Sequence, residues 1–276
     1  MPPSPPGTMA VAAILAGREA RARLTSPWFW AVASAVCLLA WLYGAGFVAA
    51  FATESVLVTT DPLMALNILV VAFLGLVLGL RLAASMAWER EHRTLEVLLV
   101  GPAGWIAIVA AKFLAELAVL VLLVALYAAY LLAAQPLGAG VIGAGELAGL
   151  GAMPLFALPV MALGLLIGAG LATVRAAVVA FLVLVGVLAA FEIARGLLAA
   201  QPVEQMSLTG LYLRHALDVA APAVHLVSAA GQLARPVEAL LAQAPLHAAE
   251  SAAALALTLV TLAAAMAVGR ARGALA

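Results

Sequence analysis

The sequence predicts an all-α integral membrane protein with six transmembrane helices, and three observations support this fold class. Hydrophobic residues make up 67% of the 276 residues and charged residues only 9%, whereas soluble domains have roughly 45–50% and about 25%. The mean hydropathy of +1.20 indicates that hydrocarbon is the main solvent of the chain. Since a charge at the bilayer centre costs about 3 kcal/mol, charge-free stretches mark the helices. They run over 24–53, 62–80, 117–145, 147–174, 176–191 and 251–269.

Each stretch predicts one span of about 20 residues. The fifth reaches that length only if it continues past Glu192 and Arg195, which lie three residues apart and can pair near the helix end. Lys112 and Glu116, an i,i+4 pair in the first turns of the third span, are interpreted as an ordinary ion pair near the membrane surface in preference to a transport role. The predicted spans are 28–51, 62–86, 104–132, 149–173, 176–199 and 251–269.

The segments outside the predicted spans differ from the spans in composition. Residues 1–8 are proline-rich and are expected to form a disordered leader, with Met9 as an alternative start, ahead of a single transmembrane domain over 9–276. Residues 9–24 mix apolar and charged residues and predict an interfacial helix on the cytoplasmic leaflet, with a frayed tail as the alternative. Residues 200–250 predict amphipathic or re-entrant helices at the outer face, because apolar patches alternate there with four prolines.

Arginine and lysine placement predicts the orientation. With a cytoplasmic N-terminus, only Arg195, Arg214 and Arg235 fall outside, and the positive-inside rule then places both termini in the cytoplasm. The inside set is Arg18, Arg21, Arg23, Arg81, Arg90, Arg93, Lys112, Arg175, Arg270 and Arg272.

Several function classes find no support in the residues. A formal net charge of zero gives no basic footprint for a nucleic-acid partner. Cys37 is the single cysteine, and the histidines are scattered apart from a loose His215 and Asp218 pair, so no metal site is expected. Lys112 is the only lysine and follows Ala111, which excludes a G-x-x-x-x-G-K-[ST] phosphate loop. We therefore expect no enzyme active site and no cofactor bound by this chain.

The connector after the second span carries the most informative pattern. Charged residues of both signs precede Thr94, which can cap a short helix, and Gly101-Pro102 then ends that helix. Leu95, Leu98 and Leu99 form one apolar ridge at i, i+3 and i+4. The pattern predicts a short amphipathic helix at the cytoplasmic surface, while a charged loop that only fixes topology is the alternative.

This connector resembles that of the type-2 ABC transporter permease family, in which an acidic, basic, acidic triplet precedes Thr-Leu-Glu, a leucine pair and a proline, with Gly-Lys or a similar pair about ten residues on. Arg93 stands where the family usually has glycine. The six-span order, the N-terminal helix and the long outer segment agree with the family over the whole chain. The matching residues are Glu89, Arg90, Glu91, Thr94, Leu95, Glu96, Leu98, Leu99, Pro102 and Lys112.

The resemblance implies a permease subunit of an ABC exporter in the bacterial inner membrane. The connector would be a coupling helix that docks on a separate ABC ATPase subunit, which carries the ATP and Mg, while a second permease chain, identical or related, completes the complex in the lipid bilayer. Two alternatives remain from other classes. A proton-coupled secondary carrier would use Glu116 or Glu192 as its titratable group, and a non-transporting membrane scaffold would need neither. The transported substance is not indicated, although walls of Ala, Leu, Val and Gly suit a hydrophobic or bulky cargo.

Overall fold

The computed structural model describes residues 8–54, 62–95, 104–134, 150–151, 153–202, 206–227 and 248–273, and its elements are all helices. Within these residues, six helical segments are long and apolar enough to cross a membrane, which confirms the number of predicted spans. The leader residues 1–7, connector residues 96–103 and outer residues 203–205 and 228–247 lie outside the described residues. The elements are α1 (Thr8–Leu24), α2 (Pro27–Glu54), α3 (Pro62–Glu91), α5 (Trp105–Ala134), the 3₁₀ helix η2 (Met153–Ala157), α7 (Leu158–Gly170), α8 (Val174–Ala200), α9 (Leu208–Val227) and α11 (Ala248–Gly273).

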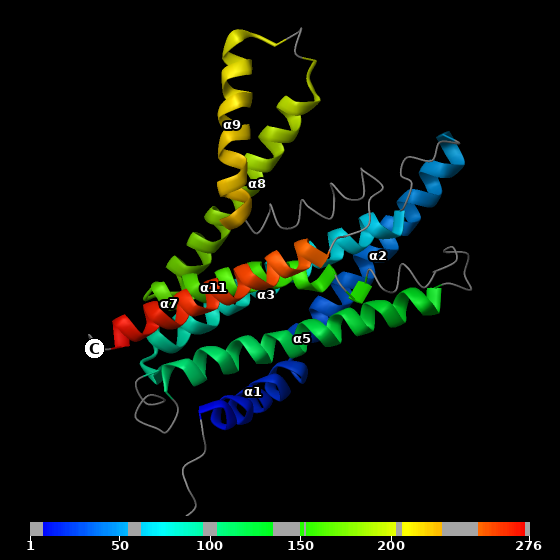
Figure 1. The fold of residues 1–276 in the computed structure, drawn as a ribbon. Helices are drawn as coiled ribbons and strands as arrows, with labels where there is room; N and C mark the ends of the chain where they lie inside the picture. The colour runs from blue at the N-terminus through cyan, green and yellow to red at the C-terminus, as the bar shows by residue number, and fades with distance from the viewer. Residues whose placement is uncertain are drawn as a thin grey trace, which may run out of the picture.

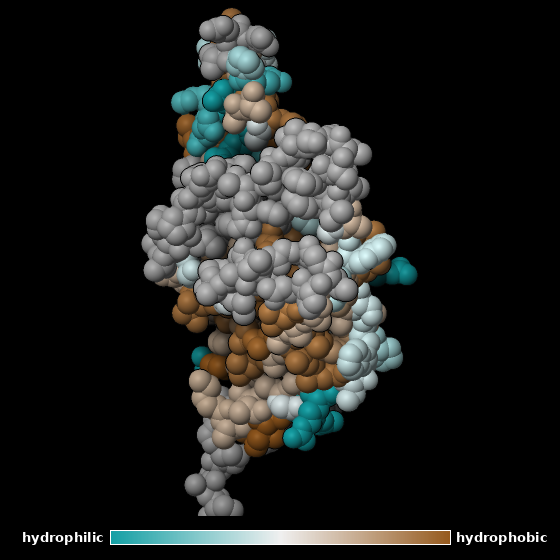
Figure 2. All heavy atoms as spheres, turned by 90° about the vertical axis from the view of Figure 1, so that its right-hand side faces the viewer, coloured by the Kyte–Doolittle hydropathy of each residue, from teal (hydrophilic) through white to brown (hydrophobic). Residues whose placement is uncertain are grey.

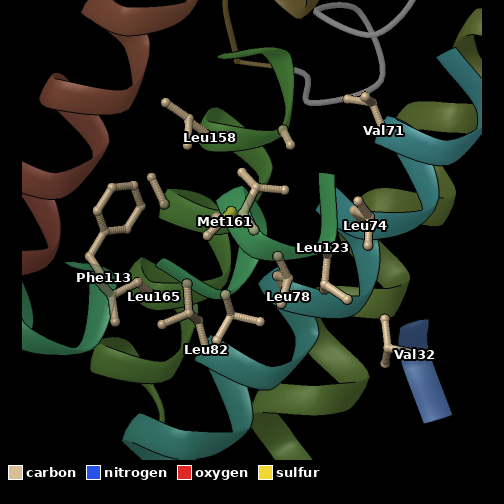
Figure 3. Close-up of a cluster of buried hydrophobic side chains, with 14 of the residues drawn as sticks. Val32, Val71, Leu74, Leu78, Leu82, Phe113, Leu123, Leu158, Met161 and Leu165 are labelled. Atoms are coloured by element: carbon tan, nitrogen blue, oxygen red, sulfur yellow. The ribbon is translucent and has the colours of Figure 1, made fainter. Parts of the chain in front are cut away.

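Helices α3 and α7 form the centre of the molecule, and α5 and α11 pack against them (Figure 1). Leu74, Leu78 and Leu82 follow one face of α3, and they meet Met161 and Leu165 of α7 (Figure 3). All five are fully buried. The outward faces of the helices stay apolar, and Figure 2 shows such residues gathered over the middle of one face, with hydrophilic residues near its two ends. This distribution is that of a multi-pass membrane protein.

Helices α3 and α7 cross with their backbones in close contact, because glycines face each other at the crossing. A Cβ on Gly164 would overlap the backbone of Gly79, and one on Gly168 would lie 2.5 Å from the carbonyl oxygen of Ala83. Gly75, Gly79 and Ala83 recur at every fourth residue of α3, and Gly164 and Gly168 have the same spacing on α7. This small-x-x-x-small pattern lets membrane helices approach each other closely.

The fourth span, predicted as one helix over 149–173, consists of two helical elements over Met153–Gly170. A 3₁₀ helix over 153–157 precedes α7, and the candidate span is limited to Met153–Gly170. Proline explains the break, since Pro154 and Pro159 have no backbone N–H to donate and Pro159 sits in the first turn of α7, where none is needed.

Helix α1 is the helix expected before the first span. Its C-terminal carbonyls are capped by the hydroxyls of Thr25 and Ser26, which donate to Arg21 O at 3.1 Å and to Arg23 O at 2.7 Å. The chain turns there and enters α2 at Pro27. Helix α1 packs lengthwise against α5 and runs in the same direction (Figure 1). It is therefore packed into the helix bundle, and its predicted place at the membrane surface stays a prediction.

Helix α9 lies beside α8, and the two form a hairpin that extends away from the other helices (Figure 1). It occupies 208–227 of the predicted outer segment. Leu208, Tyr212 and Val219 are exposed on its outer face, while Leu217 and Ala221 are more covered. A helix with one such apolar exposed face is the amphipathic type that the sequence predicts for this segment.

Helix α3 continues to Glu91, five residues beyond the predicted end of the second span. After it, Arg93 has φ 57°, the left-handed conformation in which glycine is favoured. A left-handed turn residue, a position where glycine is favoured, is thus present here as arginine.

Replacement of Arg93 should reveal the cost of this conformation. Arg93→Gly removes a left-handed penalty of about 1 kcal/mol, so the melting temperature of the purified protein in detergent should stay level or rise. Arg93→Val should lower the melting temperature, because a β-branched residue fits this conformation poorly. Equal melting temperatures for the two variants would contradict the φ value.

Candidate functional site

Charged side chains gather where α1, α3 and α5 meet. We call this group the ion network, and it consists of Glu19, Arg23, Arg81, Glu89, Lys112 and Glu116. The three acidic and three basic residues balance each other in charge. Five ion pairs connect them and join the three helices.

Glu116 of α5 is the most deeply buried member, with 0% of its side chain exposed. Its Oε1 lies 2.7 Å from Nη1 of Arg23 and 3.5 Å from Nε of Arg81. The other terminal nitrogen of Arg23 bonds Oε2 of Glu19 at 2.6 Å. Arg81 also stacks over the ring of Trp28, 4.0 Å from its centroid, which is cation–π geometry.

Lys112 is held by carboxylates from two other helices. Its Nζ lies 2.7 Å from Oε1 of Glu89 on α3 and 3.7 Å from Oε1 of Glu19 on α1, and only 4% of its side chain is exposed. The structure therefore corrects the expected i,i+4 pair near the membrane surface: Lys112 and Glu116 each pair across helices and inside the bundle. The pairs of Glu19 with Lys112 and of Arg23 with Glu116 also fix the parallel register of α1 and α5.

The depth of the ion network follows from helix geometry. Glu116 is eleven residues after the start of α5, which is about 16 Å along the helix axis. A charge buried in a helix bundle is costly unless charged partners replace the lost water. The balanced set of carboxylates, guanidinium groups and the ammonium group provides opposite charges within ion-pair distance, while both carboxylate oxygens of Glu116 make no hydrogen bond to the described residues.

The triplet Glu89, Arg90 and Glu91 at the end of α3 connects three different helices. Glu89 pairs with Lys112 of α5. Arg90 donates from Nη1 to the carbonyl oxygen of Ala169 at 2.8 Å, in the last turn of α7. Oε2 of Glu91 accepts from the backbone N–H of Val174 at 2.9 Å, at the first residue of α8.

The contacts of Arg90 and Glu91 provide hydrogen-bond partners for backbone groups at helix ends. The last carbonyls and the first N–H groups of a helix lack partners within the helix. A cation at the C-terminal end and an anion at the N-terminal end also match the helix dipole. Arg90 and Glu91 therefore tie the tight turn between α7 and α8 to the end of α3, and Glu89 ties the same end to α5.

Beyond these contacts, α3 ends in an exposed surface that we call the tip, made of Trp88, Glu91, His92, Arg93 and Thr94. The rings of Trp88 and His92 stack with centroids 4.3 Å apart. Thr94, which is predicted to cap the short helix after it, donates its hydroxyl to the Glu89 carbonyl at 3.1 Å, at the end of α3. Leu95 is buried at 7% exposure. The other predicted coupling residues, Glu96, Leu98, Leu99 and Pro102, lie outside the described residues.

Glu192 and Arg195 are not part of the ion network. Nε of Arg195 lies 3.6 Å from Oε2 of Glu192, within α8. Among the described residues there is also no group of three or more His, Cys, Asp or Glu side chains that could hold a metal ion.

Sequence reasoning missed Glu19, Arg23 and Arg81 as site residues. A signal was present for Arg81, because it lies inside the predicted second span, and an ionisable residue within a span marks a functional position by default. No such signal existed for Glu19 or Arg23, whose partners are about 93 residues away in the chain.

The fold and the ion network define a polytopic α-helical membrane protein whose second span ends in a charged motif tied to its neighbours. The chain also matches a known family. The model of the ABC-2 family transporter proteins matches residues 13–272, so the chain belongs to this family and is an ABC transporter membrane permease. No curated protein sequence gives a significant match to the chain.

Proposed function

We propose that this chain is the membrane subunit of an ATP-driven exporter, in which a separate ABC ATPase subunit hydrolyses ATP and drives the permease through the tip of α3 and the connector that follows. ATP and Mg are bound by that partner, since this chain has no phosphate loop. Two permease chains, identical or related, act with two ATPase subunits in a bacterial inner membrane.

One observation carries the proposal. The exposed tip is continuous with a triplet that bonds Lys112 of α5, Ala169 of α7 and Val174 of α8. A partner that moves the tip therefore moves four helices together, which is the rigid-body response that coupling by ATP-driven closure needs. A loop whose only role is to fix topology has no need of such contacts.

The proposed orientation places the tip in the cytoplasm. When both termini are cytoplasmic, ten arginines and lysines lie on the cytoplasmic side and three lie on the outer side. Arg93, one of these ten, and His92 are exposed at the tip. An ATPase subunit, which is a cytoplasmic protein, reaches this surface only in that orientation.

The structure favours this function over a proton-coupled carrier. Such a carrier needs a titratable group that a proton can reach from both sides in turn. Glu116 is fully buried and paired with both Arg23 and Arg81, so its geometry is that of a structural ion pair. Glu192 is paired with Arg195 on its own helix.

Charge reversal at the tip tests the proposal. We expect His92→Glu with Arg93→Glu to lower co-purification of the ATPase subunit and its permease-dependent ATPase activity at least about tenfold, because an interface hot spot contributes about 2 kcal/mol or more. Both side chains are exposed, so the melting temperature should change little. The measurements are pull-down of the ATPase subunit from native membranes and ATP hydrolysis in proteoliposomes.

A matched control exists on α9, where Arg214 and His215 are the same residue types at neighbouring positions. Arg214→Glu with His215→Glu should leave both readouts unchanged. The proposal would fail if no ATPase subunit co-purifies with the wild-type permease, or if the two double variants behave alike.

A further inference from the structure

The outer face of α1 carries basic and apolar side chains that no other described residue covers. Its inner face packs on α5 through Val11, Ala12 and Ala16, and Arg23 enters the ion network from the same side. The opposite face points away from the molecule, at whose edge α1 lies (Figure 1).

Three side chains define that outer face. Ile14 and Arg18 are four residues apart and Arg21 follows three later, so all three lie on one side of the helix. Ile14 is 69% exposed, and both arginines are exposed. Gly17 lies between them, and a Cβ built on it would have no neighbour within 4 Å. The face is open along its length.

The arginines of this face lack the partners that the other charges of α1 have. Glu19 and Arg23 are paired within the ion network. Arg18 and Arg21 make no ion pair with any described residue. Like charges at i,i+3 repel each other, so two adjacent arginines favour an anion that both can bond. Guanidinium groups match phosphate in geometry.

We propose that this face binds the headgroup of an anionic phospholipid, with Arg18 and Arg21 on the phosphate and Ile14 against an acyl chain. Exposed apolar residues beside cations are the pattern of helices that bind at the headgroup boundary. A soluble phosphate would satisfy the arginines and leave Ile14 in water, so a lipid is the better match to the whole face. Anionic lipid would then brace α1 against α5, and through the ion network against α3.

Native mass spectrometry of the purified permease tests this directly. The protein is equilibrated with micelles that contain equal parts of phosphatidylglycerol and phosphatidylcholine, and the ratio of the two bound lipids is measured. Each basic residue near an anionic surface contributes about a fivefold preference. The wild-type protein should therefore prefer phosphatidylglycerol, and Arg18→Gln with Arg21→Gln should reduce that preference by roughly 5- to 25-fold.

Two further variants make the result specific. Arg18→Lys with Arg21→Lys retains the charge and should keep most of the preference. Arg175→Gln with Arg270→Gln removes the same charge from two other exposed positions and should leave the preference as it is in the wild type. A preference that survives the first glutamine pair, or that falls equally with the second pair, would overturn the proposal.

An acidic protein surface is the other partner that could suit this face. In that case the Arg18→Gln and Arg21→Gln variant would lose a co-purifying protein while the lipid ratio stayed unchanged, which would also overturn the proposal. The measurement needs only the permease and lipids. Its outcome is therefore independent of whether the tip of α3 drives transport.

Discussion

Gly164→Ala should destabilise the permease by about 2–4 kcal/mol, far more than an alanine does at an ordinary helical glycine. The added methyl group has no space, because its position overlaps the backbone of Gly79 on α3. Backbone cannot move aside as the end of a side chain can, so α3 and α7 must separate. Separation also exposes part of the leucine contact at the centre of the molecule. Melting temperature in detergent and the yield of monodisperse protein measure the effect.

Gly186 provides the matched control on α8. A Cβ there would meet nothing within 4 Å, so Gly186→Ala should be neutral or raise stability by up to about 1 kcal/mol, through the higher helix propensity of alanine. Similar losses in the two alanine variants would show that α3 and α7 do not cross at Gly164. A conservative Gly164→Ser should fail as Gly164→Ala does, because any Cβ meets the same backbone.

The span count could be predicted because it depends on one strong local signal. A charge-free stretch near 20 residues long has few alternatives to a membrane helix, and each predicted span has a helical counterpart. The fourth span was the partial exception. Pro154 and Pro159 were visible in the sequence, but whether they kink a helix or end it depends on what packs around them, and here a 3₁₀ turn precedes α7.

Only part of the crossing of α3 and α7 could be predicted from the sequence. Gly164 and Gly168 are four residues apart in the predicted fourth span, a spacing that allows close approach to another helix but does not identify which one. Gly75 and Gly79 have the same spacing in the second span. Spacing of this kind shows which face can pack closely, whereas the choice of partner depends on tertiary packing.

The same limit applies to the ion network. The sequence placed Lys112 and Glu116 on one helix face, so an i,i+4 pair was the nearest interpretation. Tertiary partners replaced it, because Glu89 and Arg23 bring opposite charges within 2.7 Å from other helices. Local spacing shows which pairs can form within a helix, and it contains no information on charges that arrive from elsewhere in the chain.

Glu116→Leu should cost about 3–5 kcal/mol in stability, because it leaves the buried Arg23 and the partly buried Arg81 without their shared carboxylate. The variant turns a balanced ion network into one with three cations and two anions. Arg23→Met in the same chain restores the balance, and the double variant should recover a large part of the loss. This recovery separates charge imbalance from the loss of side-chain volume, since methionine is no better a partner for leucine than the aliphatic part of arginine.

An exposed pair gives the reference for this experiment. Arg214 and Asp218 on α9 are 4.0 Å apart, with 32% and 53% of their side chains exposed, and water screens such pairs so that they contribute at most about 1 kcal/mol. Asp218→Asn should therefore shift the melting temperature little. If Glu116→Leu behaved like Asp218→Asn, or if Arg23→Met added to its loss, the ion network would not be the element that joins α1, α3 and α5. If the double variant recovers, the charges act as one unit, and motion applied at Glu89 is transmitted to α5 and α1 through them.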